Sequence, residues 1–186
     1  LISSGGVVSP VLVTLDTRSR NLGTAQLDGI DFSAKYVLDT RIGSFDASVS
    51  GNYRLSQKSQ ALPSLPVSDD LAFNTPVFRM QGTLGTTIGS LRAQVIWNHT
   101  SGYKRGNVEF GQTRVSSFDA INLFFKYDVK SKSALTDDLS FTLNVQNLFD
   151  VAPPEFRSAT GIGYDTTLGS AFSIGRIVQL GGSKKF

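Results

Sequence analysis

The feature that most constrains this fold is a set of long segments in which apolar and polar residues alternate. From Leu139 to Gln146, every odd position is apolar and every even position is polar. This period of two places all apolar side chains on one face of a β-strand and all polar ones on the other. The alternation recurs along the chain, with exceptions at Ile96 and Phe124. It predicts an all-β protein with eight strands near residues 7–16, 25–38, 44–56, 75–88, 90–102, 117–130, 138–149 and 170–186.

The length of these segments points to a membrane. Most exceed the roughly 5–6 residues of a soluble strand and match the ~9–11 residues that a tilted strand needs to cross a bilayer. The mean hydropathy of −0.04 fits, because lipid-facing and lumen-facing residues cancel in such strands. No run of about 18 apolar residues exists, so a membrane-spanning helix is excluded.

The links between the segments alternate in length. Short or moderate links at 39–43, 88–90 and 130–137 alternate with longer polar ones at 57–74, 103–116 and 150–169. Short periplasmic turns and long outer loops are typical of an antiparallel, up-and-down transmembrane β-barrel, and we predict this architecture.

The two faces of the predicted strands have different roles. Polar side chains are expected to face the lumen, mostly as a hydrated wall and less often as contacts of a plug or substrate. These are Arg54, Arg79, Arg92, Asn98, Asn122, Lys126, Asn144 and Gln146. Aromatic residues near strand ends are expected to form an interfacial girdle at the depth of the lipid head groups. These are Tyr36, Tyr53, Trp97, Tyr103, Phe118, Tyr127 and Phe149. Arg176 and His99 fall on the apolar face near the outer interface, where a charged tip can snorkel into the head groups.

The sequence predicts no catalytic residue, metal site or cofactor. The single His99 has no Ser or carboxylate at a telling spacing, and cysteine is absent. The pairs Asp69–Asp70 and Asp137–Asp138 have the chemistry of Ca²⁺ ligands, but solvated turns are the favoured interpretation. Gly161-Ile162-Gly163 lacks the following helix that a phosphate site requires. The net charge of +3 is scattered, so no nucleic-acid partner is expected.

Several motifs resemble those of one protein family. Asn147-Leu148-Phe149-Asp150 resembles the "N-L-F-D" signature in the penultimate strand of TonB-dependent outer-membrane receptors. A Pro-bearing loop and a final strand with Gly175-Arg176 follow it, and the chain ends in the aromatic Phe186. Upstream, Gly29-Ile30-Asp31 is similar to the "G-[VI]-[ED]" strand of that family, with Asp where Glu is commoner.

The resemblance implies a barrel of about 22 strands with a plugged lumen. Such a barrel imports siderophore-iron, cobalamin or oligosaccharides across the outer membrane of a Gram-negative bacterium, with energy from the TonB complex acting through an N-terminal plug. Phe186 resembles the signal that the barrel-assembly machinery recognises. Residues 1–186 include no segment that resembles the plug or a signal peptide, and they have room for about a third of the strands. We therefore expect residues 1–186 to be the C-terminal portion of the barrel, unable to transport alone.

Two alternatives remain at this stage. Eight strands also suffice for a small closed barrel that serves as a structural anchor or a narrow pore. A soluble lipocalin-like barrel needs an apolar interior for its ligand, so the two faces would have to be reversed. A soluble, monodisperse monomer without detergent would favour this last alternative.

Overall fold

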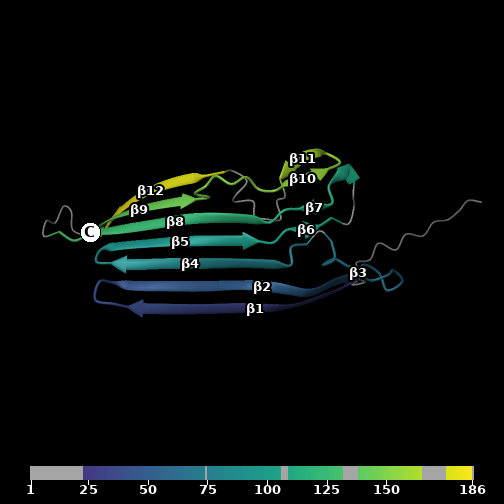
Figure 1. Ribbon diagram of the computed structural model, residues 1–186, viewed down its shortest axis with the longest axis horizontal. Coiled ribbons are helices and arrows are strands. Elements are labelled where there is room, and N and C mark those ends of the chain that lie inside the picture. The colour runs from purple at the N-terminus through teal and green to yellow at the C-terminus, as the bar shows by residue number, and fades with distance from the viewer. Residues whose placement is uncertain (1–22, 74, 106–108, 132–137, 165–174, 186) are drawn as a thin grey trace, which may run out of the picture.

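The computed structural model describes residues 23–73, 75–105, 109–131, 138–164 and 175–185. Its main element is one antiparallel sheet with the strand order β1-β2-β4-β5-β8-β9-β12 (Figure 1). The bounds are β1 Thr24–Asp39, β2 Ser44–Gln60, β4 Phe78–Ile88, β5 Leu91–Thr100, β8 Phe118–Val129, β9 Leu139–Gln146 and β12 Ile177–Lys184. A two-residue strand, β3 (Ser68–Asp69), pairs with β2. The predicted all-β, antiparallel up-and-down arrangement is confirmed.

The long strands match the sequence prediction closely. Six of the eight predicted strands are present within four residues of their expected bounds. For the predicted strand 170–186, β12 begins only at Ile177, and residues 170–174, like the segment 7–16, lie outside the described residues. β2 continues to Gln60 instead of ending at residue 56, because its last residues pair with β1 beyond the alternating region. Among the described strands, β1 and β12 are the two ends of the order. No helix in the described ranges is both long enough and apolar enough to span a membrane.

Cross-strand register assembles the alternating residues into two unlike faces. One row runs across all seven long strands and is apolar throughout: Tyr36, Ala47, Leu84, Val95, Leu123, Val145 and Val178. The next row on the opposite face has polar side chains on four of the seven strands: it consists of Val37, Asp46, Gly85, Gln94, Phe124, Asn144 and Gln179. We call the first the outward face and the second the inner face.

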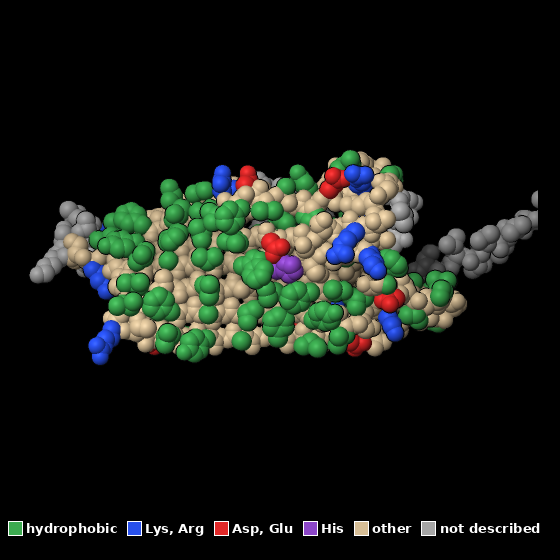
Figure 2. All heavy atoms as spheres, viewed as in Figure 1, with side chains coloured by type: hydrophobic (Ala, Val, Ile, Leu, Met, Phe, Trp, Pro, Cys, Tyr) green, Lys and Arg blue, Asp and Glu red, His purple; other side chains and the backbone are tan. Residues whose placement is uncertain are grey.

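The outward face leaves large apolar side chains exposed. Leu84 is 65% exposed and Leu180 is 83% exposed. Figure 2 shows hydrophobic side chains spread over this face of the sheet, with most Lys and Arg side chains near its ends or margins. A soluble protein rarely exposes an apolar surface of this extent, so the face needs a hydrocarbon environment or a partner.

The register between β1 and β2 shifts at one position. Asp28 pairs with Ser56 while Gly29 pairs with Arg54, so Leu55 is the extra residue of a β-bulge. A Cβ on Gly29 would lie 2.9 Å from the carbonyl oxygen of Tyr53, closer than real side chains come. Gly29 thus permits the two backbones to approach at the bulge.

The outer loops contain secondary structure that the sequence did not predict. The link between β5 and β8 holds β6 (Tyr103–Lys104), the 3-10 turn η1 (Glu109–Gly111) and β7 (Arg114–Val115). The link between β9 and β12 holds the hairpin of β10 (Glu155–Ser158) and β11 (Gly161–Tyr164). In Figure 1 these pieces lie together at the end of the sheet opposite the short turns.

The buried core of the described residues lies under these loops. Tyr103, Val115, Phe118 and Ala120 are each at most 6% exposed, and Phe156 packs against them. Phe118 and Ala120 pair with Thr100 and Asn98, which places them on the inner face. The loops are therefore folded over the inner face at its outer end.

The prediction that Tyr103 and Phe118 belong to the interfacial girdle is wrong. Both rings are buried in the loop core, at 6% and 4% exposure. They lie near strand ends, as girdle residues do, but long-range packing of the loops covers them.

Candidate functional site at the inner face and the outer loops

The inner face carries an ion pair that crosses a strand. Asp46 on β2 binds Arg92 on β5, with Nη2 of Arg92 donating to Oδ2 of Asp46 at 3.0 Å and Nη1 donating to Oδ1. Between them lies β4, which presents Gly85. A Cβ on Gly85 would lie 2.5 Å from Nη2 of Arg92 and 2.7 Å from Oδ2 of Asp46. Because Gly85 has no side chain, Asp46 and Arg92 can reach each other across β4.

A second charged group on the inner face neighbours the first. Lys126 lies directly opposite Arg92 across the β5–β8 pair. Its Nζ is 2.8 Å from Oδ1 of Asp128, and Ser140 also donates to that carboxylate at 2.8 Å. Because each cation has its own carboxylate, the like charges of Arg92 and Lys126 coexist on adjacent strands.

The other residues predicted to face the lumen also lie on the inner face by register. Arg54 donates to Oε1 of Gln57 at 3.2 Å, and Asn144 donates to Oε1 of Gln179 at 3.2 Å. The remaining four positions are Arg79 opposite Asn52, Asn98 opposite Gln81, Asn122 opposite Ile96, and Gln146 opposite Ile177. The structure distributes these side chains over the sheet and does not gather them into one pocket.

The Asn147–Asp150 motif forms a tight turn that ends β9. Asn147 is fully buried and has a φ of 50°, a left-handed conformation that Asn tolerates better than most residues. Its side chain accepts from the backbone N–H of Val151 at 3.0 Å and donates to the Val151 carbonyl at 2.9 Å. Its own N–H donates to Oδ1 of Asn122 at 2.9 Å. The side chain of Asn122 thus caps the end of the neighbouring strand.

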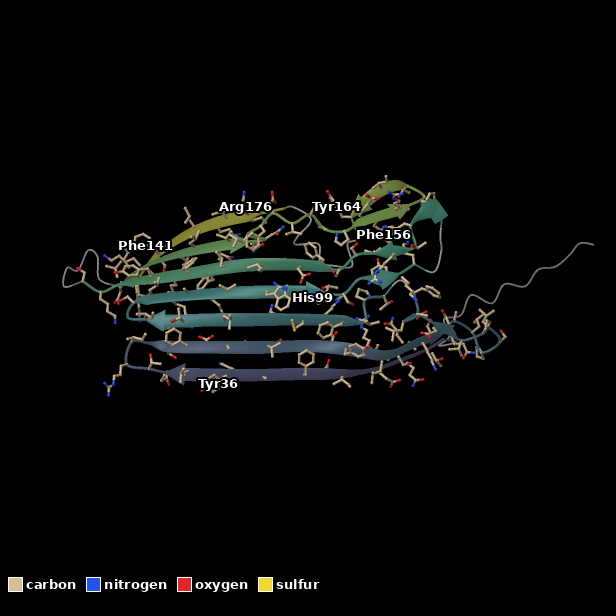
Figure 3. The ribbon with its side chains drawn as sticks, in the orientation of Figure 1. Tyr36, His99, Phe141, Phe156, Tyr164 and Arg176 are labelled. Atoms are coloured by element: carbon tan, nitrogen blue, oxygen red, sulfur yellow. The ribbon has the colours of Figure 1, made fainter. Side chains whose placement is uncertain are left out.

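The same turn also holds the start of β12. Oδ1 of Asp150 accepts from the backbone N–H of Arg176 at 2.8 Å, and Nη1 of Arg176 donates to the Leu148 carbonyl at 3.3 Å. A Cβ on Gly175 would lie 2.9 Å from that same Oδ1. Two motifs far apart in the sequence therefore form one junction (Figure 3 labels Arg176).

The outer loops are joined through Gln112. Its Oε1 accepts from Nη1 of Arg105 at 3.0 Å and from the backbone N–H of Arg157 at 2.9 Å. Its Nε2 donates to the Glu155 carbonyl at 2.7 Å. The Arg105 guanidinium also lies 4.2 Å from the centre of the Phe156 ring, a cation–π distance. Beside this contact, a polar cavity of about 360 Å³ is lined by residues of both loops, including Arg114 and Arg157.

The outward face contains a polar group that sequence spacing did not reveal. Pairing of β5 with β8 places His99 opposite Asp119. Oδ1 of Asp119 lies 2.8 Å from Nδ1 of His99 and accepts from Nε1 of Trp97 at 2.8 Å. The sequence offered His99 no carboxylate partner because the two residues are far apart along the chain. Asp119 thus provides a partner for the indole N–H of Trp97 and for one ring nitrogen of His99.

The remaining predicted positions have simple placements. Tyr36, Tyr53, Trp97 and Tyr127 are on the outward face, at 41–65% exposure, and Phe149 is 66% exposed. Asp69 accepts from the backbone N–H of Leu71 at 3.1 Å, as a turn residue does. Gly161 and Gly163 are in the β10–β11 hairpin, and Asp137 and Phe186 lie outside the described residues.

One antiparallel sheet with an apolar face, a more polar face and loops folded over one end has the arrangement of a β-barrel wall. A family model described as TonB dependent receptor-like, beta-barrel, matches residues 2–148. The chain belongs to this family, whose members work in TonB-dependent transport at the outer membrane. No curated protein and no solved structure gives a significant match.

Proposed function

We propose that this chain is the C-terminal barrel portion of a transporter that imports a scarce nutrient across the outer membrane of a Gram-negative bacterium. The substrate belongs to the siderophore-iron, cobalamin or oligosaccharide class. The observation that carries the proposal is the pair of unlike faces on one continuous sheet, together with family membership. An N-terminal plug, encoded upstream, couples the barrel to the TonB complex, and the barrel-assembly machinery recognises Phe186.

The outer loops support substrate contact at the entrance of the barrel. They fold over the inner face, where Phe118 and Ala120 hold them, so a solute that enters the lumen must pass them. Gln112 also joins the two loops by hydrogen bonds beside the polar cavity that Arg114 and Arg157 line. A preorganised cavity binds a ligand with less loss of conformational entropy than mobile loops do.

The test is an uptake assay in cells that lack the receptor. The complete gene, and separately the segment for residues 1–186, are expressed in strains with and without TonB, and growth is measured on a panel of iron chelates, cobalamin and oligosaccharides. We expect the complete gene to restore growth on one substrate only when TonB is present, and the segment alone to restore none.

Two results would contradict the proposal. Uptake that persists without TonB, or ion leakage through membranes carrying residues 1–186 alone, would favour a self-contained small barrel. A soluble monomer obtained without detergent would remove the membrane assignment altogether.

A further inference from the structure

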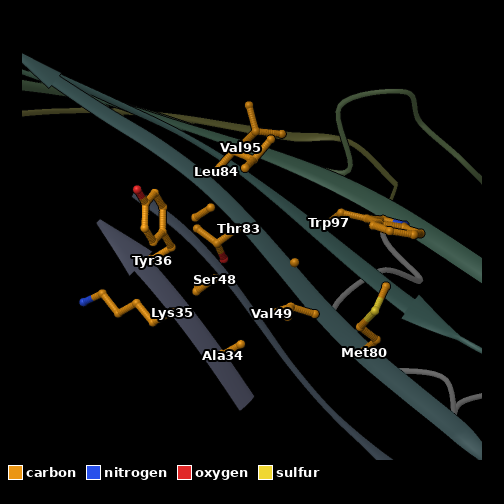
Figure 4. Close-up of a pocket in the computed structure, with 12 residues that line it drawn as sticks. Ala34, Lys35, Tyr36, Ser48, Val49, Met80, Thr83, Leu84, Val95 and Trp97 are labelled. Carbon is orange, nitrogen blue, oxygen red and sulfur yellow. The ribbon is translucent and has the colours of Figure 1, made fainter. Parts of the chain in front are cut away.

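The outward face contains a hollow of about 500 Å³ over β1, β2, β4 and β5 (Figure 4). Small residues on neighbouring strands provide its floor, namely Ala34, Val49 and Gly82 in one cross-strand row and Ala47 in the next. Larger side chains such as Leu84 and Trp97 stand around them. Lys35, Ser48 and Thr83 border the hollow too, but register assigns them to an inner-face row.

The hollow lies within the apolar part of the sheet. On the side of the hollow nearer the short turns lies a cross-strand row that contains Leu38, Phe45 and Ala93. Toward the outer loops, a group of rings closes it: Phe78 lies 6.2 Å from Phe32 and 5.7 Å from His99 between ring centres. With these side chains on its two sides, the hollow faces the acyl chains of the surrounding lipid.

The polar atoms at its edge do not call for a polar ligand. The indole N–H of Trp97 and Nδ1 of His99 both meet Oδ1 of Asp119. Because the indole N–H of Trp97 already donates to Asp119, the Trp97 ring can line an apolar hollow without leaving a hydrogen-bond donor unsatisfied.

We propose that the hollow is a binding site for one acyl chain of a membrane lipid. The inference rests on the proposed membrane setting. Lipid tails and apolar side chains are equally apolar, so association in a bilayer depends on packing, and an unfilled hollow forfeits the dispersion contacts of its lining. A flexible acyl chain fills a concave surface that a flat neighbouring protein face would leave open.

Trp97 is the only tryptophan of the chain, and it lines the hollow, so its fluorescence reports on the occupant. The protein is inserted, with any further segments that its gene encodes, into vesicles of phosphatidylcholine brominated near the middle of its acyl chains. Any tryptophan in those segments is replaced by phenylalanine. Bromine quenches an indole on contact, so quenching is measured against unbrominated vesicles.

Two glycine variants give a matched comparison. Gly82→Leu fills the hollow, since a Cβ there would lie 3.6 Å from the Trp97 ring. Gly182→Leu adds the same side chain to the outward face of β12, opposite Phe141, where a Cβ meets nothing within 4 Å. We expect the native protein and Gly182→Leu to be quenched alike, and Gly82→Leu to be quenched less by roughly a factor of two, because one side of the indole ring loses its lipid contact.

Native mass spectrometry after detergent extraction provides a second readout. We expect one retained lipid for the native protein and Gly182→Leu, and none for Gly82→Leu. Equal lipid retention in the two variants would overturn the acyl-chain site. A dimer without quenching in the native protein would also overturn it, because a second copy then covers the hollow. If the protein inserts into vesicles but shows equal lipid retention or an unquenched dimer, only the acyl-chain site is refuted. If the protein does not insert into vesicles, the membrane assignment is refuted.

Discussion

Replacing Asn147 is the sharpest test of the junction between β9 and β12. The alanine variant loses two hydrogen bonds to Val151, and an orphaned polar group costs about 1–3 kcal/mol. Alanine also pays about 1–2 kcal/mol in the left-handed conformation that Asn147 adopts. Val151 is 39% exposed, so water replaces part of what is lost. We therefore expect Asn147→Ala to destabilise the barrel by about 2–4 kcal/mol.

Two companion variants separate these causes. Asn147→Gly loses the same hydrogen bonds but tolerates the positive φ, so it should be about 1 kcal/mol less damaging than alanine. Asn144→Ala, on β9, removes an exposed bond to Gln179 of β12 and should cost no more than about 1 kcal/mol. Urea unfolding of the barrel in lipid vesicles, followed by circular dichroism, measures all three. If Asn147→Ala and Asn144→Ala unfold at the same urea concentration, the junction does not stabilise the barrel as argued.

Three further substitutions test the faces and the loops. Leu84→Arg should cost about 2–4 kcal/mol in vesicle unfolding, because it puts a charge into hydrocarbon, while its neighbour Thr83→Arg on the inner face should cost close to zero. Equal costs would mean that the faces are misassigned. Gly85→Ala should destabilise by about 1–3 kcal/mol in the same assay through its clash with the ion pair. Gly82→Ala, where the added carbon makes only ordinary contact, is its control and should be near neutral. Gln112→Ala should open the outer loops, so limited proteolysis should cut residues 155–164 roughly tenfold faster, and an unchanged rate would show that Gln112 does not hold them.

The long strands and their faces could be predicted because period-two alternation is a local signal. Ile30 to Tyr36 and Leu139 to Gln146 carry it without interruption, and each lies in a strand of the sheet. The junction motif was recognisable as a family resemblance, although its geometry was not. A buried Asn with a positive φ, bonded to Val151, is invisible to a pattern of hydropathy.

The loop structure could not be predicted, because it depends on contacts between distant segments. Gln112 joins Arg105 to Glu155 and Arg157, and neither the polar composition of the loops nor their length indicates this pairing. Likewise, Asp119 reaches His99 only after the β5–β8 register is set. A local pattern shows which side of a strand a residue occupies, but only register shows its neighbour.

The inner face of β8 connects the wall of the barrel to its entrance. Phe118 and Ala120, near its outer end, are the base on which the loop core packs, and Asn122, the next inner-face residue, caps the turn that starts the following loop. These three residues therefore fix the positions of two loops through one strand. β5 pairs with β8 at all three residues, and β9 pairs with β8 from Leu123 onward, so the sheet supports the loops through this strand. The entrance of the barrel thus owes its shape to a strand whose own side chains do not reach the polar cavity between the loops.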